Sequence, residues 1–331
     1  MVVISVASIN EKVIPMSELV SFHEIQTTDS EALKIEITNS LLQKNASLSP
    51  KFLYDNLGSH LFAAITLLPE YYPTRTEELI FKEYADSISQ TVGTSRVFID
   101  LGAGNCQKAA QLFSKLTPTH YFALDISVQY LREILPKLQG QYPQIQMAGV
   151  GVDFSKKLLL PSAVPKSERV FFYPGSSLGN FSAIEAIDFL KQIKEQACHG
   201  GLLFGIDLMK ESPILYQAYD DPLKVTAAFN LNILRVVNHL IGTNFEVQNF
   251  SHQIVINEEL MRVELYVESL KNQVVSWPGH ERVFEVGERI HTENSHKYTL
   301  NSIKIILEEA GLQLQKIWQD PKNWFAVIYA K

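Results

Sequence analysis

The stretch that decides the fold is VFIDLGAGN at 97–105. A short apolar run ends in an acid, Asp100, and two glycines, Gly102 and Gly104, follow at once. The next ten residues, QKAAQLFSKL (107–116), carry apolar side chains at helical spacing. A strand, a glycine loop and a helix in this order form the usual cradle for a nucleoside-containing ligand, because glycines let the backbone approach the ligand closely.

The same rhythm continues outward from this loop. Further apolar runs at 121–125, 146–154, 170–175 and 201–208 alternate with expected helices at 127–138 and 182–197. The runs show no polar alternation, which is typical of strands that are buried on both faces. An α/β fold with a parallel sheet and helices on both faces is therefore expected.

The rhythm changes after residue 208, which predicts a second domain. Residues 211–243 look helical, and 244–291 alternate like antiparallel strands. After 297 a helix and two strand-like runs would complete the first sheet. The predicted division is therefore 75–208 plus 297–331 for the ligand-binding domain and 1–74 plus 209–296 for the other. Within the latter, a helix capped by Asp29 or Ser30 is expected at 29–44.

Composition limits the classes of function. The 331 residues carry a net charge of −7, with no run of Lys or Arg, so a nucleic-acid partner is not expected. Only two cysteines occur, Cys106 and Cys198, in no metal or disulfide spacing, which fits a reducing cytoplasm. Neither a signal peptide nor an apolar stretch of about 20 residues is found, so no membrane association is expected. The prediction is a cytoplasmic protein.

Two ligands compete for the glycine loop. A dinucleotide site usually reads GxGxxG, whereas Gln107 stands here in place of the third glycine. Asp100 would repel a phosphate but attract a cation, which favours S-adenosylmethionine. Asp125 ends the second strand, where a carboxylate can accept ribose hydroxyls, and Asp153 with Phe154 ends the third strand, where an adenine would lie. A nicotinamide-dependent oxidoreductase stays the alternative.

Several longer motifs resemble one family. They are KFLYDNLGSHLFAAITLLPEYYPTRTE (51–77), DLGAGNCQK (100–108), GSSLGN (175–180), AYDDPLKVTAAFN (218–230) and HTENSHKY (291–298). Together they are similar to the histidine-specific, S-adenosylmethionine-dependent Nα-methyltransferases of ergothioneine biosynthesis. The resemblance implies a class I, Rossmann-like methyltransferase sheet with a substrate domain built from the N-terminal segment and an insertion. It also implies transfer of three methyl groups to the α-nitrogen of L-histidine, giving hercynine.

The resemblance assigns roles residue by residue. The cofactor contacts it implies are Gly102, Gly104, Lys108, Asp125, Asp153 and Phe154. The histidine contacts it implies are Tyr71, Asn180, Tyr219, Glu293 and Ser295. Tyr54 is similar to a tyrosine near the substrate amine, and it is the one candidate for a catalytic hydrogen bond, since no dedicated base is expected.

Two departures from the family pattern and two alternative substrates accompany these assignments. The loop reads GAGNCQK where some members have GSGTSEK, and Leu265 stands where some have a methionine that lines the substrate pocket. Methylation of a thiol-substituted histidine on the ring, or of a related amino acid, is the alternative within methyltransferases. His291, Glu293 and His296 fit no standard metal spacing, so no metal is expected. The chain is expected to act as a monomer.

Overall fold

The computed structural model describes residues 20–25, 29–94, 96–154 and 157–331, and its centre is an eight-stranded sheet. Six strands run parallel, and the last two, at one edge, are antiparallel to their neighbours. In order across the sheet the strands are β1 (Ser21–Glu24), β4 (Gln146–Gly151), β3 (His120–Asp125), β2 (Val97–Leu101), β5 (Arg169–Tyr173), β6 (Gly201–Asp207), β13 (Phe325–Ala330) and β12 (Leu314–Gln319).

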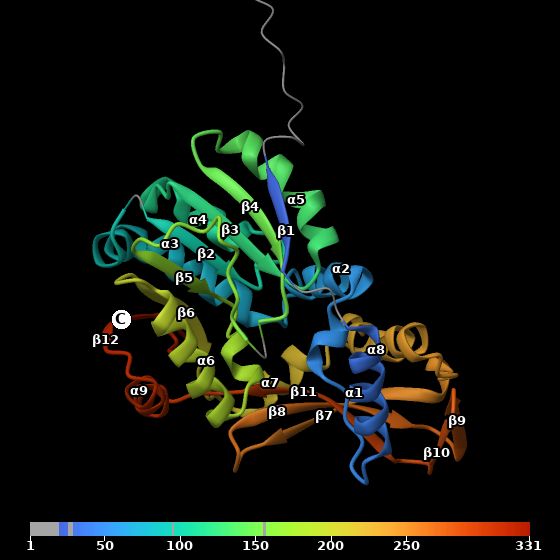
Figure 1. The fold of residues 1–331 in the computed structure, drawn as a ribbon. Coiled ribbons are helices and arrows are strands. Elements are labelled where there is room, and N and C mark those ends of the chain that lie inside the picture. The colour runs from blue at the N-terminus through green and yellow to red at the C-terminus, as the bar shows by residue number, and fades with distance from the viewer. Residues whose placement is uncertain (1–19, 26–28, 95, 155–156) are drawn as a thin grey trace, which may run out of the picture.

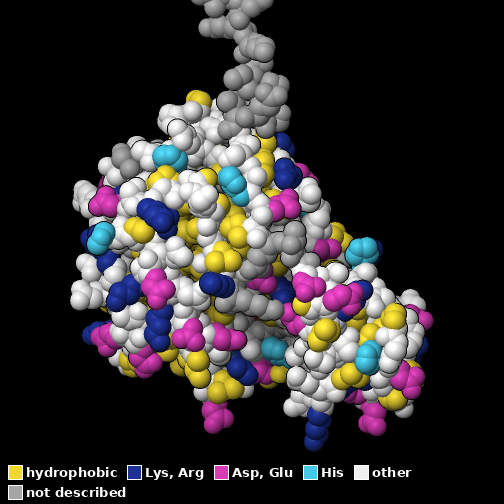
Figure 2. All heavy atoms as spheres, in the orientation of Figure 1, with side chains coloured by type: hydrophobic (Ala, Val, Ile, Leu, Met, Phe, Trp, Pro, Cys, Tyr) yellow, Lys and Arg dark blue, Asp and Glu magenta, His cyan; other side chains and the backbone are white. Residues whose placement is uncertain are grey.

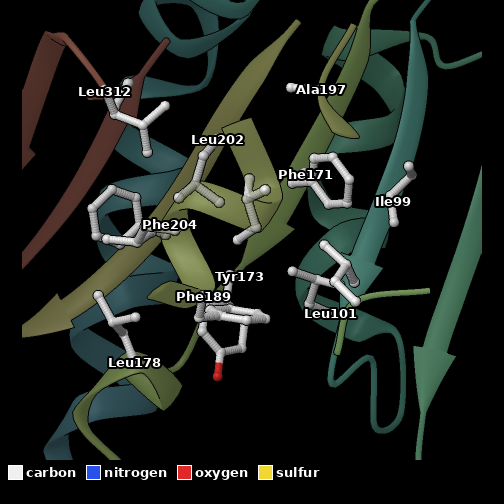
Figure 3. Close-up of a cluster of buried hydrophobic side chains, with 14 of the residues drawn as sticks. Ile99, Leu101, Phe171, Tyr173, Leu178, Phe189, Ala197, Leu202, Phe204 and Leu312 are labelled. Carbon is white, nitrogen blue, oxygen red and sulfur yellow. The ribbon is translucent and has the colours of Figure 1, made fainter. Parts of the chain in front are cut away.

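Helices cover both faces of this sheet. One apolar cluster joins it to α3 (Tyr72–Val92), α4 (Gln107–Leu116) and α5 (Val128–Gln141). A second joins the opposite face to α6 (Ala183–Gln196) and α9 (Leu300–Glu309). Figure 3 shows this second cluster, in which side chains of β2, β5 and β6 lie side by side on one face of the sheet, with Phe189 of α6 beside them. Burial on both faces explains why these strands carry uninterrupted apolar runs.

The remaining elements form a second layer beside the sheet, in the lower right of Figure 1. A three-stranded antiparallel sheet, ordered β11-β8-β7, and the β9–β10 ribbon share one apolar cluster with α1, α2 and α8. The elements of this part are α1 (Ser30–Leu42), η2 (Pro50–Leu53), α2 (Asn56–Ile65), α7 (Ser212–Tyr219), α8 (Val225–Ile241), η4 (Val247–Asn249), β7 (Phe250–Asn257), β8 (Arg262–Ser269), β9 (Gln273–Trp277), β10 (His280–Phe284) and β11 (Arg289–His296).

The insertion expected from the change of rhythm leaves and re-enters the large sheet at one place. Leu208, which follows β6, forms a bridge with Tyr298, which follows β11. After that point α9, β12 and β13 complete the sheet, as predicted. Asp29 caps α1, and its side chain accepts hydrogen bonds from two backbone N–H groups. Among the described residues, no helix combines the length and apolar character that a membrane crossing requires.

One part of the N-terminal segment departs from the expected division. Ser21–Glu24 pair with Ala148–Gly151 and so extend the large sheet, although 1–74 were assigned to the substrate domain. A four-residue strand whose partner lies more than a hundred residues away leaves no periodic signal in the sequence. The expected boundary at residues 74 and 75 also falls inside α3, which begins at Tyr72. Residues 1–19 lie outside the described part of the chain.

Candidate active site

The glycine loop lies between β2 and α4 and is held by Asp125 at the end of β3. Gly102 and Gly104 have φ values of 70° and 50°, which glycine adopts readily. The Gly104 N–H donates to Asp125 Oδ2 at 2.9 Å, and the Ser127 N–H donates to Asp125 Oδ1 at 2.9 Å. Burial raises the pKa of Asp125, whereas these backbone donors act to lower it. The carboxylate thus fixes the loop and keeps lone pairs for hydroxyl donors.

Asp100, at the end of β2, is a buried acid with a free oxygen. The Tyr121 hydroxyl donates to Asp100 Oδ2 at 2.7 Å, whereas Oδ1 has no hydrogen-bond partner among the described residues. Burial raises the pKa of Asp100 to about 7, although the Tyr121 hydrogen bond opposes this. An acceptor left open beneath the loop suits a ligand with an ammonium or sulfonium group better than one with a phosphate.

Lys108 is anchored by a residue that the sequence analysis did not single out. Lys108 Nζ lies 2.6 Å from Glu77 Oε2, and the Gly175 N–H donates to Glu77 Oε1 at 2.8 Å. Glu77 is fully buried on α3, and a Cβ on Gly205 would lie 2.0 Å from its Oε1. Lys108 is therefore held above the carboxyl ends of β5 and β6.

Asp153 and Phe154 follow β4 on the same edge of the sheet. The Phe154 ring stacks on Phe189 at 5.8 Å, and the nearest atom to a Cβ on Gly102 would be a carbon of Phe154, at 3.9 Å. Lys51 Nζ lies 3.7 Å from Asp153 Oδ2. The glycine loop, Asp125 and Phe154 therefore surround one space. The open acceptor of Asp100 and the cradle around Gly102 fit S-adenosylmethionine, which Gly102, Gly104, Lys108, Asp125, Asp153 and Phe154 would hold.

Glu293 and Asn180 form a contact near the carboxyl end of β5, away from the glycine loop. Asn180 ends η3 (Ser177–Asn180), and its Nδ2 donates to Glu293 Oε1 at 3.0 Å. The pairing register of β11 shifts between His291 and Glu293, and such a bulge re-aims the side chains around it. The contact also needs Gly179, because a Cβ there would lie 2.8 Å from the His296 carbonyl oxygen.

Glu293 is electrostatically unusual. Its side chain is only 7% exposed, and burial raises its pKa to about 7, although Lys297 and Asn180 act to lower it. A carboxylate in this position gains strongly from any ligand N–H that it can accept, because water is largely excluded.

Ser295 and Tyr219 form a second polar contact two residues further along β11. The Tyr219 hydroxyl and Ser295 Oγ lie 2.7 Å apart, and Lys297 Nζ lies 2.7 Å from each. Lys297 also pairs with Asp207 at 2.9 Å. Burial acts to raise the pKa of Asp207, but Lys297 and Lys210 outweigh it, so this pKa lies below its ordinary value.

Aromatic rings line the space next to these polar groups. Tyr54 packs edge-on against Phe62 and Phe229, with centroids 5.6 and 5.4 Å away. Tyr71 packs against Phe62 at 6.2 Å and against Tyr219 at 6.3 Å. Burial, with smaller contributions led by Glu293, raises the pKa of Tyr54 well above its ordinary value of 10.0. Tyr54 is therefore a neutral phenol near physiological pH, suited to hydrogen bonding and not to proton abstraction.

The structure brings the predicted residues together in two adjoining groups. Asp125, Lys108, Gly102, Gly104, Asp153 and Phe154 lie around the glycine loop, and Tyr54, Tyr71, Tyr219, Asn180, Glu293 and Ser295 lie around the aromatic rings. Sequence reasoning missed Glu77, Asp207 and Lys297. A signal existed for two of them, because Asp207 ends a buried strand and Lys297 continues the alternation of Glu293 and Ser295.

A sequence-family model described as histidine-specific methyltransferase, SAM-dependent, matches residues 33–331. The chain belongs to this family. It is similar to the histidine N-alpha-methyltransferase of Mycolicibacterium smegmatis, with 32% identity over 91% of this chain and 95% of that one. It is also similar to ergothioneine biosynthesis protein 1 of Schizosaccharomyces pombe, with 30% identity over 82% of this chain and 37% of that one. Among solved structures, the CcbJ methyltransferase of Streptomyces caelestis aligns over 76% of this chain and 95% of that one, with 14% identity and a TM-score of 0.47.

Membership in the histidine-specific family confirms the class of enzyme and the cofactor. S-adenosylmethionine is the cofactor, and the chain is a methyltransferase. The mostly parallel sheet with helices on both faces is the expected class I architecture. The nicotinamide-dependent alternative is therefore wrong. The absent third glycine and the acid before the loop were the sequence features that separated the two ligands.

Proposed function

We propose that this chain transfers three methyl groups in succession from S-adenosylmethionine to the α-amino nitrogen of L-histidine, giving hercynine. The observation that carries the proposal is the pairing of a buried acceptor, Glu293, with a hydroxyl pair, Tyr219 and Ser295, beside an aromatic wall. An imidazole ring offers one N–H and one lone pair, which these groups complement. The name of the mycolicibacterial relative supports the choice of the α-nitrogen.

The aromatic wall serves the amine. Bound cofactor supplies a sulfonium methyl that is already activated, so the protein has to position the amine and keep it unprotonated. Tyr219 is buried and Tyr54 and Tyr71 are partly buried, and a desolvated surrounding disfavours the ammonium form of an amine. Before each transfer the ammonium form loses one proton, so that the nitrogen lone pair is free to form the new N–C bond as the C–S bond breaks.

Repeated transfer needs a pocket that does not depend on fixed acceptors for the amine. Each methyl group removes one N–H donor and adds bulk, and the final product is a quaternary ammonium. Aromatic faces such as Tyr54 and Phe62 attract such cations without requiring an N–H. Tyr71 and Asn180 are proposed to hold the substrate carboxylate, and Asn180 keeps a second N–H beyond the one given to Glu293.

The strand next to Glu293 contributes an apolar side chain. Leu265 pairs with Glu293 in the strand register and packs with Tyr219 in one cluster. Since leucine and methionine have similar volume, replacement of the methionine found in some members should change substrate affinity only modestly.

The cellular setting and the two-domain division are part of the same proposal. A cytoplasmic monomer is proposed, without a nucleic-acid or membrane partner, because every proposed site residue comes from one chain and the net charge is −7. On the face shown in Figure 2, basic and acidic side chains alternate. We propose that the substrate unit comprises most of 1–74 with 209–296, and that 75–208 with 297–331 bind the cofactor.

Mass spectrometry of a reaction containing L-histidine and S-adenosylmethionine tests the proposal directly. The expected product carries three methyl groups, and fragmentation places all of them on the α-nitrogen. A product methylated on the ring, or turnover only with a thiol-substituted histidine, would reassign the substrate within methyltransferases. No turnover with histidine would refute the proposed function.

A further inference from the structure

Lys297 is buried, and all its donors are engaged. The residue follows β11, and its side chain is fully shielded from solvent. Its Nζ lies 2.9 Å from Asp207 Oδ2, 2.7 Å from the Tyr219 hydroxyl and 2.7 Å from Ser295 Oγ. A lysine ammonium has three N–H groups and no acceptor, so each contact uses one donor.

This arrangement determines where the hydrogen atoms of the Tyr219 and Ser295 hydroxyls can point. Both oxygens accept a hydrogen bond from Lys297, and they lie 2.7 Å from each other. One of the two hydroxyl hydrogens therefore lies between Tyr219 and Ser295. The other hydrogen has no acceptor within this group of three side chains. Whichever residue carries it, the pair presents one O–H to its surroundings.

We propose that Lys297 is a positioning residue. Its hydrogen bonds hold the Tyr219 and Ser295 hydroxyls so that one O–H stays available to donate to the unprotonated ring nitrogen of histidine. We call this arrangement of the three side chains the lock. Glu293, two residues before Ser295 on the same strand, then accepts the ring N–H. The inference rests on the proposed function, which places the imidazole against these residues. It adds that Lys297 is the residue that keeps the hydroxyl pair in the state of a donor to the neutral ring.

The carboxylate of Asp207 stabilises the buried charge of Lys297. Asp207 balances Lys297, and its carboxylate also accepts from the Tyr72 hydroxyl at 2.7 Å and pairs with Lys210. Loss of Lys297 alone therefore leaves Asp207 with two partners, so the variant is expected to fold. Without the ammonium, the hydroxyls become free to rotate and to donate to each other or toward Asp207.

Pyrrolylalanine is the probe for the donor. Its ring keeps one N–H but has a C–H in place of the acceptor nitrogen, and its 2-linked and 3-linked isomers cover both ring positions. In the wild type, an O–H without an acceptor makes pyrrolylalanine a poorer substrate than histidine by about 10- to 100-fold in kcat/KM. Equal use of histidine and both isomers by the wild type would overturn the inference without any variant.

Lys297→Met tests the lock, and Lys210→Met is the matched control. Both substitutions remove a lysine that pairs with Asp207, but only Lys297 contacts Tyr219 and Ser295. In Lys297→Met we expect the preference for histidine over pyrrolylalanine to fall to within about threefold, mainly through a higher KM for histidine. Lys210→Met should keep the wild-type preference.

Cofactor binding distinguishes the possible failures. Calorimetric titration with S-adenosylhomocysteine checks that each variant is folded. If Lys297→Met binds it normally and keeps the full histidine preference, the lock does not exist. If Lys297→Met does not fold, Ser295→Ala replaces it, and an unchanged preference in that variant has the same meaning. A wild-type enzyme that leaves the α-nitrogen of histidine unmethylated refutes the proposed function instead.

Discussion

Replacing Glu293 with glutamine should stabilise the fold at alkaline pH while weakening turnover of histidine. Burial raises the pKa of Glu293 from 4.5 to about 7. Between these two pH values the folded protein still holds a proton that the unfolded chain has released, so the free energy of unfolding falls as the pH rises. Above pH 7 the carboxylate is ionised in both states and its cost to the folded state is fully present. Glutamine has the same shape and never has that cost.

The size of the effect follows from the two pKa values. This difference in pKa corresponds to about 3 kcal/mol of stability at pH 8, and to about 0.8 kcal/mol at pH 5. For a chain of this length, 3 kcal/mol raises the thermal midpoint by about 4 °C. Asp100, whose pKa burial also raises to about 7, is present in both proteins and cancels in the comparison. Glutamine still accepts a ring N–H but without a charge, so kcat/KM for histidine should fall about tenfold.

The assay compares thermal midpoints of wild type and Glu293→Gln at pH 5 and pH 8, with S-adenosylhomocysteine affinity as the control. The thermal midpoint of the variant should exceed that of the wild type by about 4 °C at pH 8 and by about 1 °C at pH 5, and the affinity should not change. An equal difference in midpoint at both pH values would show that the carboxylate is solvated. Unchanged histidine kinetics in the variant would show that Glu293 does not contact the ring.

Three further substitutions test the cofactor side of the site. Asp125→Ala should weaken S-adenosylhomocysteine binding, measured by calorimetry, by about 1.5–3 kcal/mol, because it removes a charged acceptor and the anchor of Gly104; unchanged affinity would exclude a ribose contact. Glu77→Ala leaves Lys108 without its partner and should lower the free energy of unfolding, measured with denaturant, by about 3–5 kcal/mol. A decrease of less than about 1 kcal/mol would show that the ion pair is not buried. Gly205→Ala puts a Cβ 2.0 Å from Glu77 Oε1, so it should lower stability by at least about 2 kcal/mol in the same assay, and a wild-type midpoint would refute that packing.

Local patterns were sufficient for most of the fold. The strand, loop and helix around Gly102 follow from one apolar run and two glycines, and Asp29 predicts the start of α1 through its capping chemistry. The insertion could be placed because the period of the apolar residues changes after residue 208 and the sheet pattern returns after 297. These signals lie within short windows of sequence, so no knowledge of the tertiary contacts is needed.

The residues that support the site could not be found in this way. Glu77 lies in the second turn of a long helix, and nothing in its sequence neighbours shows that its carboxylate meets Lys108 and the Gly175 N–H. Lys297 continues the alternation of Glu293 and Ser295, but nothing near it in the sequence shows that it pairs with Asp207, ninety residues earlier. The family resemblance points to side chains that contact ligands. Glu77 and Lys297 instead hold other side chains in place, and only the packing of the folded chain shows which distant residue each of them contacts.

The segment between Gly175 and Asn180 connects the residues proposed to bind the cofactor with those proposed to bind the substrate. The sheet reverses its strand order between β2 and β5, and in such sheets ligands bind where the order reverses. Gly175 donates to Glu77 on the cofactor side, and Ser176 Oγ accepts the Asp207 N–H at 2.8 Å. Four residues later Asn180 reaches Glu293. A shift of this loop would therefore move the groups proposed to anchor the cofactor and the imidazole together, and we expect this coupling to keep the amine in line with the methyl group during the proposed successive transfers.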